Sequence, residues 1–335
     1  MVTRAIMIVY IVIYVRQSYN LKRYILFIVM SEFLKKSFFE PGVYTVIPTI
    51  FKNNKVCMKS IFNLINFQIE NNIKNIVLLG TTSEAPVLSD DEKEMIVKTI
   101  WENYSNKLNI IVGIGGNNTE KVLALGMKLR NYCNSFLVTV PNYNKPTQLG
   151  ILKHFSVIAE GLSEKPLMLY NIPSRCGINM EPEIIGKLYD ENDNIMAIKE
   201  ASGSMSQILS IKSLCEISIF SGDDSLILPI ISLGGIGVVS VSSNLIPKQI
   251  LEIVDNCILE NYKMARNIFY KFYGLFKMLF LETNPVPLKY LLFKNKMVSS
   301  NEVRLPLVEL EEENKMKLDI ISEVFVKNQN KIFKT

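Results

Sequence analysis

The sequence predicts an α/β protein of the (β/α)8 class, the TIM barrel. Short, β-rich apolar runs alternate with longer helical patterns, and the runs are continuous and do not alternate with polar residues, which is typical of parallel strands buried on both faces. There are eight of them, as a closed barrel requires: 43–48, 75–80, 109–114, 135–141, 166–171, 194–199, 217–222 and 236–241. A doubly wound open sheet is the alternative architecture.

The segments between the runs carry helix-start signals. Ser89 with Glu92 three residues later forms a capping box, and Pro182 suits the first turn of a helix. Eight β/α units within about 220 residues match the usual size of a TIM barrel. In that fold the active site lies where the strands end, so we expect functional side chains directly after the runs.

The strand pattern stops near Tyr262, and the remaining residues show a mostly helical pattern. We therefore expect a barrel domain at 39–262 and a small C-terminal helical domain at 263–335, after an N-terminal extension at 1–38. The extension holds two apolar runs, 5–15 and 24–30, and neither reaches the roughly 20 residues that span a bilayer. The residues between the two runs offer no small-residue cleavage site, which argues against a signal peptide. We therefore expect that translation starts near Met30 and that no membrane segment is present.

Charge and cysteine content argue against a nucleic-acid partner, a metal site and a disulfide framework. The net charge is +5, but four of these charges lie in the first thirty residues, which contain no acidic residue, so the rest of the chain is nearly balanced. Such a balance gives no reason to expect a nucleic-acid partner. The five cysteines are far apart, and His154 is the single histidine. We therefore expect no metal site, no disulfide framework and a reducing cytoplasm, and we assign His154 no role.

Polar residues cluster where five of the runs end. The clusters are Gly80-Thr81-Thr82-Ser83-Glu84, Pro141-Asn142-Tyr143-Asn144, Tyr170-Asn171, Lys199-Glu200 and Gly222-Asp223-Asp224. If the barrel prediction is right, all of them meet at one rim.

Lys199 is the most informative of these residues. A lysine at the mouth of a barrel loses hydration, so its pKa falls and the neutral amine, which can form an imine with a ketone, becomes available. Tyr170, Thr82 and Tyr143 offer hydroxyls for the proton transfers that imine chemistry needs. The alternative is a structural ion pair between Lys199 and Glu200 or another carboxylate, and position alone leaves both open.

At these residues the chain resembles the dihydrodipicolinate synthase and N-acetylneuraminate lyase superfamily, over nearly everything from Pro41 onward. The family turn Gly-Thr-Thr-Gly-Glu corresponds to residues 80–84. The most specific match is Tyr170-Asn171-Ile172-Pro173-Ser174-Arg175-Cys176-Gly177. Further matches are Tyr143-Asn144-Lys145-Pro146-Thr147-Gln148, Ile198-Lys199-Glu200-Ala201-Ser202-Gly203, Ser221-Gly222-Asp223-Asp224 and Asn284-Pro285-Val286-Pro287-Leu288-Lys289.

The resemblance implies a lyase without cofactor that condenses pyruvate with L-aspartate 4-semialdehyde, in the cytoplasm, on the way to diaminopimelate and lysine. By this resemblance Lys199 forms the imine, and Thr81 and Thr82 hold the pyruvate carboxylate. Tyr170 exchanges protons through Thr82 with Tyr143, which the family borrows from a second subunit. Arg175 would bind the semialdehyde carboxylate, and Gly222 and Val239 would contribute backbone contacts. The implied assembly is a homotetramer, a dimer of dimers.

The chain departs from the family pattern in three places. Ser83 replaces a glycine, and it would be strained by about 1 to 3 kcal/mol if that backbone has a positive φ. Asn142 replaces a tyrosine of the dimer interface. Lys93 and Lys121 lie where lysine-inhibited relatives carry a histidine and a glutamate, so inhibition by lysine should be weak although Asn117 is retained.

Two other functions stay open. A related pyruvate-dependent aldolase would act on a sugar acid, and Arg175 argues against it, because the sialic-acid lyases lack that arginine. A catalytically silent relative would only bind a ligand or serve in an assembly, and it would be expected to have lost the lysine or one of the hydroxyls.

Overall fold

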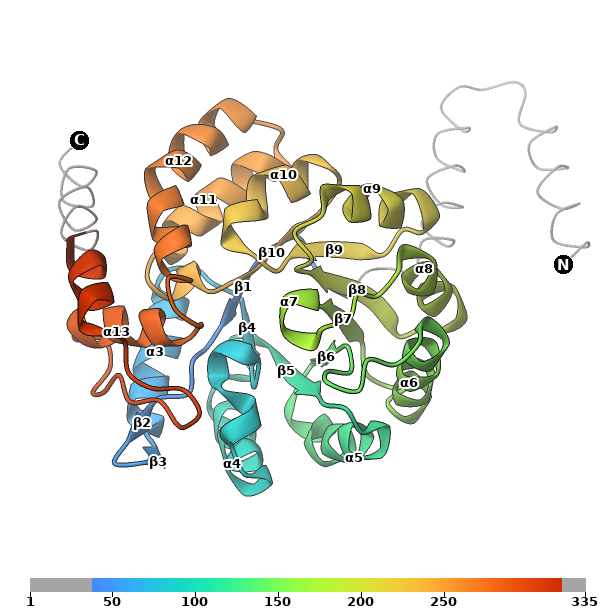
Figure 1. Cartoon of the computed structure of the whole chain (residues 1–335), viewed down its shortest axis with the longest axis horizontal. Helices are drawn as coiled ribbons and strands as arrows, with labels where there is room; N and C mark the ends of the chain where they lie inside the picture. The colour runs from blue at the N-terminus through green and yellow to red at the C-terminus, as the bar shows by residue number, and fades with distance from the viewer. Residues whose placement is uncertain (1–37, 321–335) are drawn as a thin grey trace, which may run out of the picture. The chain divides into compact units, whose positions relative to one another are not determined.

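The structure, a computed structural model, describes residues 38–320. Eight parallel strands close into a barrel in the order β1-β10-β9-β8-β7-β6-β5-β4, which confirms the predicted fold class (Figure 1). Their bounds are β1 Gly42–Val46, β4 Asn75–Leu78, β5 Asn109–Gly115, β6 Ser135–Thr139, β7 Leu167–Asn171, β8 Ile195–Glu200, β9 Ser218–Ser221 and β10 Gly237–Ser240. Each predicted apolar run corresponds to one of these strands.

Helices surround the barrel (Figure 1). They are α3 Met58–Glu70, α4 Asp90–Tyr104, α5 Thr119–Leu129, α6 Gln148–Gly161, α8 Pro182–Glu191, α9 Met205–Leu214, α10 Ile227–Ser232 and α11 Pro247–Ile258, with a short α7 Pro173–Cys176 after β7. The predicted start signals are confirmed, because Ser89 and Glu92 form a complete capping box on α4 and Pro182 opens α8. A small hairpin, β2 Phe51–Lys52 and β3 Lys55–Val56, is inserted after β1 and was not predicted.

The barrel closes between β1 and β10, where Gly42 lies opposite Gly237. A Cβ atom at Gly237 would lie 2.1 Å from the carbonyl oxygen of Gly42, so only glycine allows the two backbones to approach this closely. The apolar side chains of the strands form one continuous core with the inner faces of the helices. This core holds the strand ends, and the polar residues on them, in fixed positions.

Beyond the barrel the chain is helical, with α12 Tyr262–Met278, α13 Val286–Lys294 and a further helix at 312–320. All described residues from Phe39 onward belong to one compact unit, in which α12 packs against α11. The division into a barrel at 39–262 and a helical domain at 263–335 therefore stays a prediction. The predicted extension at 1–38, with both apolar runs, lies almost wholly outside the described residues.

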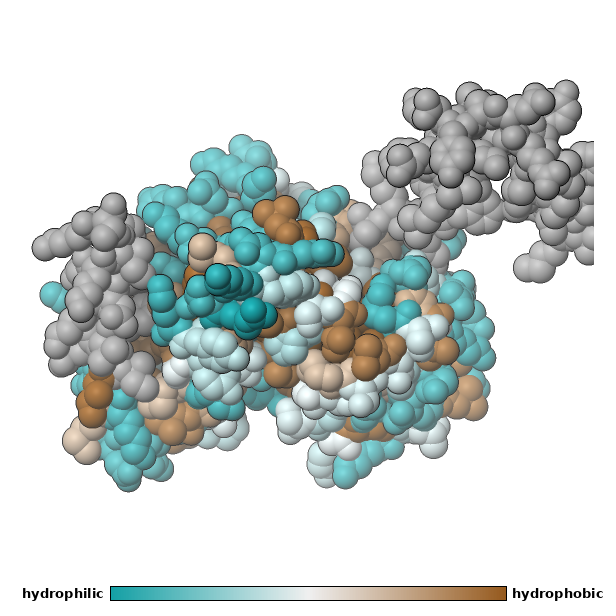
Figure 2. Space-filling model, turned by 90° about the horizontal axis from the view of Figure 1, so that it is seen from above, coloured by the Kyte–Doolittle hydropathy of each residue, from teal (hydrophilic) through white to brown (hydrophobic). Residues whose placement is uncertain are grey.

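No helix within 38–320 is long and apolar enough to cross a bilayer. On the face shown in Figure 2, hydrophobic side chains occur in several separate groups among hydrophilic ones. Scattered apolar residues of this kind are normal on a protein surface.

Candidate active site

Lys199 and Tyr170 lie side by side at the ends of neighbouring strands. The register pairs Tyr170 on β7 with Lys199 on β8, so the two side chains point to the same side of the sheet. The Nζ of Lys199 lies 4.2 Å from the centre of the Tyr170 ring. The two residues predicted to carry the chemistry are thus in contact.

The amine of Lys199 is almost completely desolvated. Lys199 is 6% exposed, and burial lowers its pKa from 10.5 to about 7, with the positive charge of Arg175 acting in the same direction. The negative charges of Asp224 and Asp223 oppose this shift without cancelling it. Gly222 makes room for the side chain, because a Cβ at that position would lie 3.1 Å from Cε of Lys199.

Glu200, the residue suggested as a structural partner for Lys199, is engaged elsewhere. Successive residues of a strand point to opposite faces, so Glu200 points away from the barrel mouth. Its buried carboxylate accepts hydrogen bonds from the side-chain amide of Asn171 (3.0 and 3.2 Å), the backbone N–H of Ser202 (2.6 Å) and the side-chain amide of Gln207 (3.0 Å). A Lys199–Glu200 ion pair is therefore excluded.

Asp224 is the buried acid that acts on Lys199 through space. One of its oxygens accepts bonds from the backbone N–H groups of Val241 (3.0 Å) and Ser242 (2.8 Å) and from the hydroxyl of Ser242 (2.8 Å). Burial nevertheless raises the pKa of Asp224. The carboxylate ties the loop after β9 to the loop after β10, close to the proposed contact residue Val239, which is 1% exposed on β10.

The threonine hydrogen-bonded to Tyr170 is Thr81. Burial raises the pKa of Tyr170 to about 12, and the hydrogen bond with the Thr81 side chain works against this shift. The hydroxyl of Thr82 instead accepts a hydrogen bond from the side-chain amide of Asn284 (3.0 Å). The structure thus brings Thr81 to the phenol, where the family resemblance led us to expect Thr82.

A cavity of about 560 Å³ opens beside this group. Its wall includes Thr81, Arg175 and Asn284, and Asn117 and Lys93 also line it. Lys199 and Tyr170 are not part of the wall, but Thr81 connects them to it, because it lines the cavity and bonds to the phenol. The space is large enough for a small ligand.

Arg175 is exposed on the short helix α7, and its guanidinium donates to the backbone carbonyl of Asn284 (3.3 Å). The guanidinium carries further N–H groups, which can bind an anion in the cavity that it lines. This geometry suits the predicted role of Arg175 as the group that binds a substrate carboxylate.

Tyr143, the third predicted hydroxyl, lies apart from the others within this chain. It is 86% exposed and has a positive φ of 66° in the loop after β6. The neighbouring Asn142 is also exposed and lines the cavity. A single chain thus does not bring Tyr143 together with Tyr170.

Ser83 fits its position without the strain that a positive φ would cause. The left-handed residue of the turn is Glu84, with φ 52° and ψ 37°, and Ser83 belongs to the 3-10 helix before it. The hydroxyl of Ser83 donates a hydrogen bond to the carbonyl of Ile47 (2.6 Å). The serine therefore ties the turn to the end of β1.

No group of three or more histidine, cysteine or acidic side chains within 38–320 is placed to hold a metal ion. His154 is buried on α6, where its Nδ1 lies 2.9 Å from the Thr119 hydroxyl and burial lowers its pKa to about 4. The five cysteines are free thiols. None of these residues lines the cavity except Cys176.

Sequence reasoning assigned no role to three residues that contact the site from the C-terminal region. Asn284 bonds to Thr82, and Lys289 and Arg304 bond to Glu84. A motif match included Asn284 and Lys289, but nothing in the sequence indicated that Lys289 is completely buried.

Comparisons with known proteins agree with this geometry. The model of the dihydrodipicolinate synthetase family matches residues 41–324. The 4-hydroxy-tetrahydrodipicolinate synthase of Methanococcus aeolicus is 43% identical over 279 residues, 83% of this chain and 96% of the relative. That of Methanocaldococcus jannaschii is 41% identical over 280 residues, with the same coverage.

Among solved structures, the 4-hydroxy-tetrahydrodipicolinate synthase of Methylacidiphilum fumariolicum SolV superimposes with a TM-score of 0.85 at 37% identity. The match covers 88% of this chain and 98% of the other. These relatives favour the synthase over a sugar-acid aldolase or a silent relative. The chain belongs to the dihydrodipicolinate synthetase family.

Proposed function

We propose that this chain catalyses the 4-hydroxy-tetrahydrodipicolinate synthase reaction, the condensation of pyruvate with L-aspartate 4-semialdehyde. The observation that carries the proposal is the desolvated amine of Lys199, whose pKa near 7 leaves it partly neutral, in contact with the phenol of Tyr170. A neutral amine beside a proton donor is what imine formation with a ketone needs.

In the first half of the reaction the amine of Lys199 attacks the ketone carbon of pyruvate. The carbon–oxygen bond breaks, the oxygen leaves as water, and a carbon–nitrogen double bond remains. Tyr170 supplies and removes protons at the nitrogen and oxygen. The hydroxyls of Thr81 and Thr82 in the turn hold the pyruvate. Backbone groups of Gly222 and Val239 contribute further contacts.

In the second half a methyl proton is lost and the imine becomes an enamine. Its methylene carbon bonds to the aldehyde carbon of the semialdehyde, whose oxygen takes up a proton and becomes a hydroxyl. The amino group of the semialdehyde then attacks the imine carbon and releases Lys199, which closes the ring. Arg175 would hold the carboxylate of the semialdehyde in the cavity.

The proton relay is proposed to run from Tyr170 through Thr81 to a tyrosine supplied by a second subunit. The hydrogen bond between Tyr170 and Thr81 supports Thr81 in this role in place of Thr82. The exposure of Tyr143 supports its use by a neighbouring subunit, because the side chain is not enclosed by its own chain. Because the relay needs a second subunit, we propose that the protein is a homotetramer built as a dimer of dimers. We also propose that it acts in the cytoplasm.

Reductive trapping tests the proposal. The protein is incubated with pyruvate and borohydride, digested, and the modified peptide is identified by mass spectrometry. We expect the added mass of a reduced pyruvate adduct on Lys199 and, in a separate assay without borohydride, consumption of semialdehyde only when pyruvate is present. An adduct on another lysine, or none, would contradict the mechanism, and turnover of a sugar acid in place of the semialdehyde would favour the aldolase.

A further inference from the structure

Two charged residues beyond the barrel contact the turn that comes after β4. Lys289 on α13 forms an ion pair with Glu84, and the backbone N–H of Arg304 donates to the other carboxylate oxygen of Glu84 (3.0 Å). The pair is completely enclosed, since the side chains of Lys289 and Glu84 are 0% and 2% exposed. We call Lys289 and Arg304 the C-terminal clamp.

The clamp fixes a strained backbone position. Glu84 adopts the left-handed conformation, which is unfavourable for a residue with a side chain and persists only where its surroundings hold it. Its backbone N–H donates to the carbonyl of Thr81 (3.0 Å), so the orientation of Glu84 is coupled to that of Thr81 and Thr82 directly before it. Holding both oxygens of the Glu84 carboxylate therefore holds the threonines.

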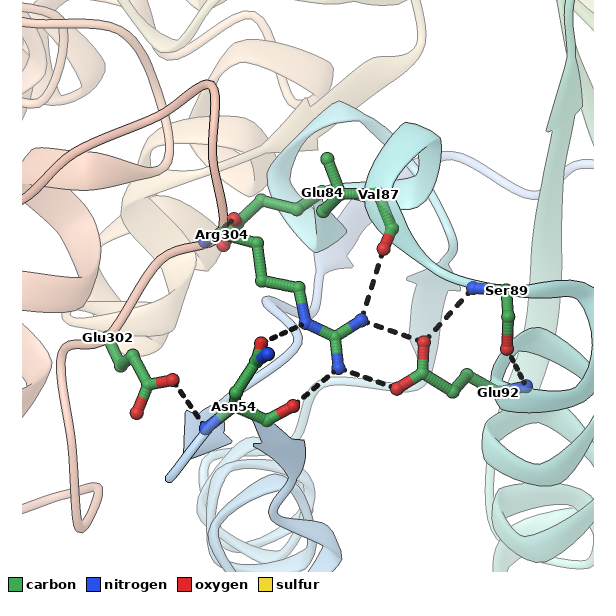
Figure 3. Close-up of polar contacts among 7 residues, drawn as sticks. All are labelled: Asn54, Glu84, Val87, Ser89, Glu92, Glu302 and Arg304. Atoms are coloured by element: carbon green, nitrogen blue, oxygen red, sulfur yellow. Dashed lines mark hydrogen bonds and ion pairs between the residues drawn. The ribbon is translucent and has the colours of Figure 1, made fainter.

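Arg304 anchors the clamp to the barrel. Its guanidinium donates to both carboxylate oxygens of Glu92 (2.6 and 2.7 Å) and to the carbonyl of Val87 (3.1 Å). It also donates to the side-chain oxygen of Asn54 (3.0 Å), as Figure 3 shows. The turn is thus held against the hairpin and the start of α4.

The ring of Phe51 packs against both cations of the clamp, with Lys289 Nζ 4.4 Å and Arg304 Cζ 4.2 Å from its centre. The Nζ of Lys289 also donates to the carbonyl of Glu302 (2.8 Å). A buried ion pair adds little stability compared with apolar residues of the same volume, since both charges lose their hydration. The ion pair instead fixes the orientation of Glu84, because the ammonium of Lys289 determines where the carboxylate lies.

We propose that Lys289 is a positioning residue, which holds the Gly80–Glu84 turn in the geometry that binds the carboxylate of pyruvate. This inference rests on the proposed function, in which Thr81 and Thr82 bind that carboxylate. Its consequence is that the segment beyond the barrel sets the affinity for pyruvate, although Lys289 itself pairs with Glu84 and not with the substrate.

The test compares two lysines on the same helix. Lys289→Met removes the cation of the clamp, and Lys294→Met removes a cation that pairs with Asp319, away from the turn. Both full-length variants are trapped with cyanoborohydride over a range of pyruvate concentrations, and the initial rate of adduct formation on Lys199 is measured by mass spectrometry. Thermal unfolding of each variant is recorded in parallel.

We expect the pyruvate concentration for half-maximal trapping to rise roughly tenfold to hundredfold in Lys289→Met, as for a binding group displaced by about 1 Å, with a smaller change in the rate at saturation. Lys294→Met should stay within about twofold of the wild type, because it leaves the turn intact. A Lys289→Met variant that unfolds at lower temperature but binds pyruvate normally would overturn the proposal.

Lys289→Met leaves the Glu84 charge buried without its cation and can fail to fold for that reason. The double variant Glu84→Gln/Lys289→Met removes both charges, and it should show the same loss of pyruvate affinity in a folded protein. Normal affinity in the double variant would refute the role of the ion pair. Absence of any Lys199 adduct in the wild type would instead refute the proposed function.

Discussion

The pH dependence of imine formation is the most direct consequence of where Lys199 lies. An ordinary lysine with a pKa of about 10.5 is a free amine in only roughly one molecule in three thousand at pH 7. With its pKa lowered to about 7 by burial, Lys199 is a free amine in about half of the molecules at that pH. The difference in reactive fraction is about a thousandfold.

The assay is the initial rate of adduct formation on Lys199 at low pyruvate, with cyanoborohydride as the reductant, between pH 5 and 10. The rate should rise about tenfold per pH unit below 7 and level off above it, because deprotonation is then complete. Lys199→Arg, which keeps the positive charge but has no nucleophilic amine, should give no adduct at that position. A rate that continues to climb to pH 10 would refute the desolvated-amine argument.

Four further results are expected. Lys199→Met should raise the free energy of unfolding below pH 7 by as much as about 5 kcal/mol, measured by denaturant unfolding. The reason is that the pKa of Lys199 is about 7 in the folded state and 10.5 in the unfolded state, so the stabilisation should shrink as the pH rises between these two values. Asp224→Asn should move the midpoint of the Lys199 pH profile lower, because that carboxylate opposes the shift. Ser83→Gly should lower the free energy of unfolding by about 1 kcal/mol, since it removes the bond to Ile47. Millimolar lysine should not inhibit turnover strongly, because Lys93 places a cation on the cavity wall.

The barrel was predictable because its strands are buried on both faces and therefore appear as continuous apolar runs. The rim residues were predictable for a related reason, since parallel strands all end at the same side of a closed sheet. The hairpin after β1 escaped prediction, as its strands are two residues long and have no periodicity to detect.

The contacts that hold the site could not be predicted from local patterns. Asn284 meets Thr82, and Lys289 meets Glu84, across about two hundred residues of chain, so no spacing rule connects them. Which of Thr81 and Thr82 contacts Tyr170 could not be predicted for a different reason. Both lie in a 3-10 turn, where side-chain direction does not follow the alternation of a strand.

The separation of Lys199 from Glu200 shows how strand geometry creates the reactive amine. The two residues are adjacent in sequence, and an ion pair between them would favour the ammonium form and raise the pKa of the lysine. Alternation along β8 instead turns the carboxylate outward, where Asn171, Ser202 and Gln207 satisfy it. The lysine is left in the barrel mouth with no carboxylate from its own strand bonded to it, so burial decides its protonation. The alternation of side chains along the strand thus separates the Glu200 carboxylate, which other residues bind, from the Lys199 amine, which must lose its proton.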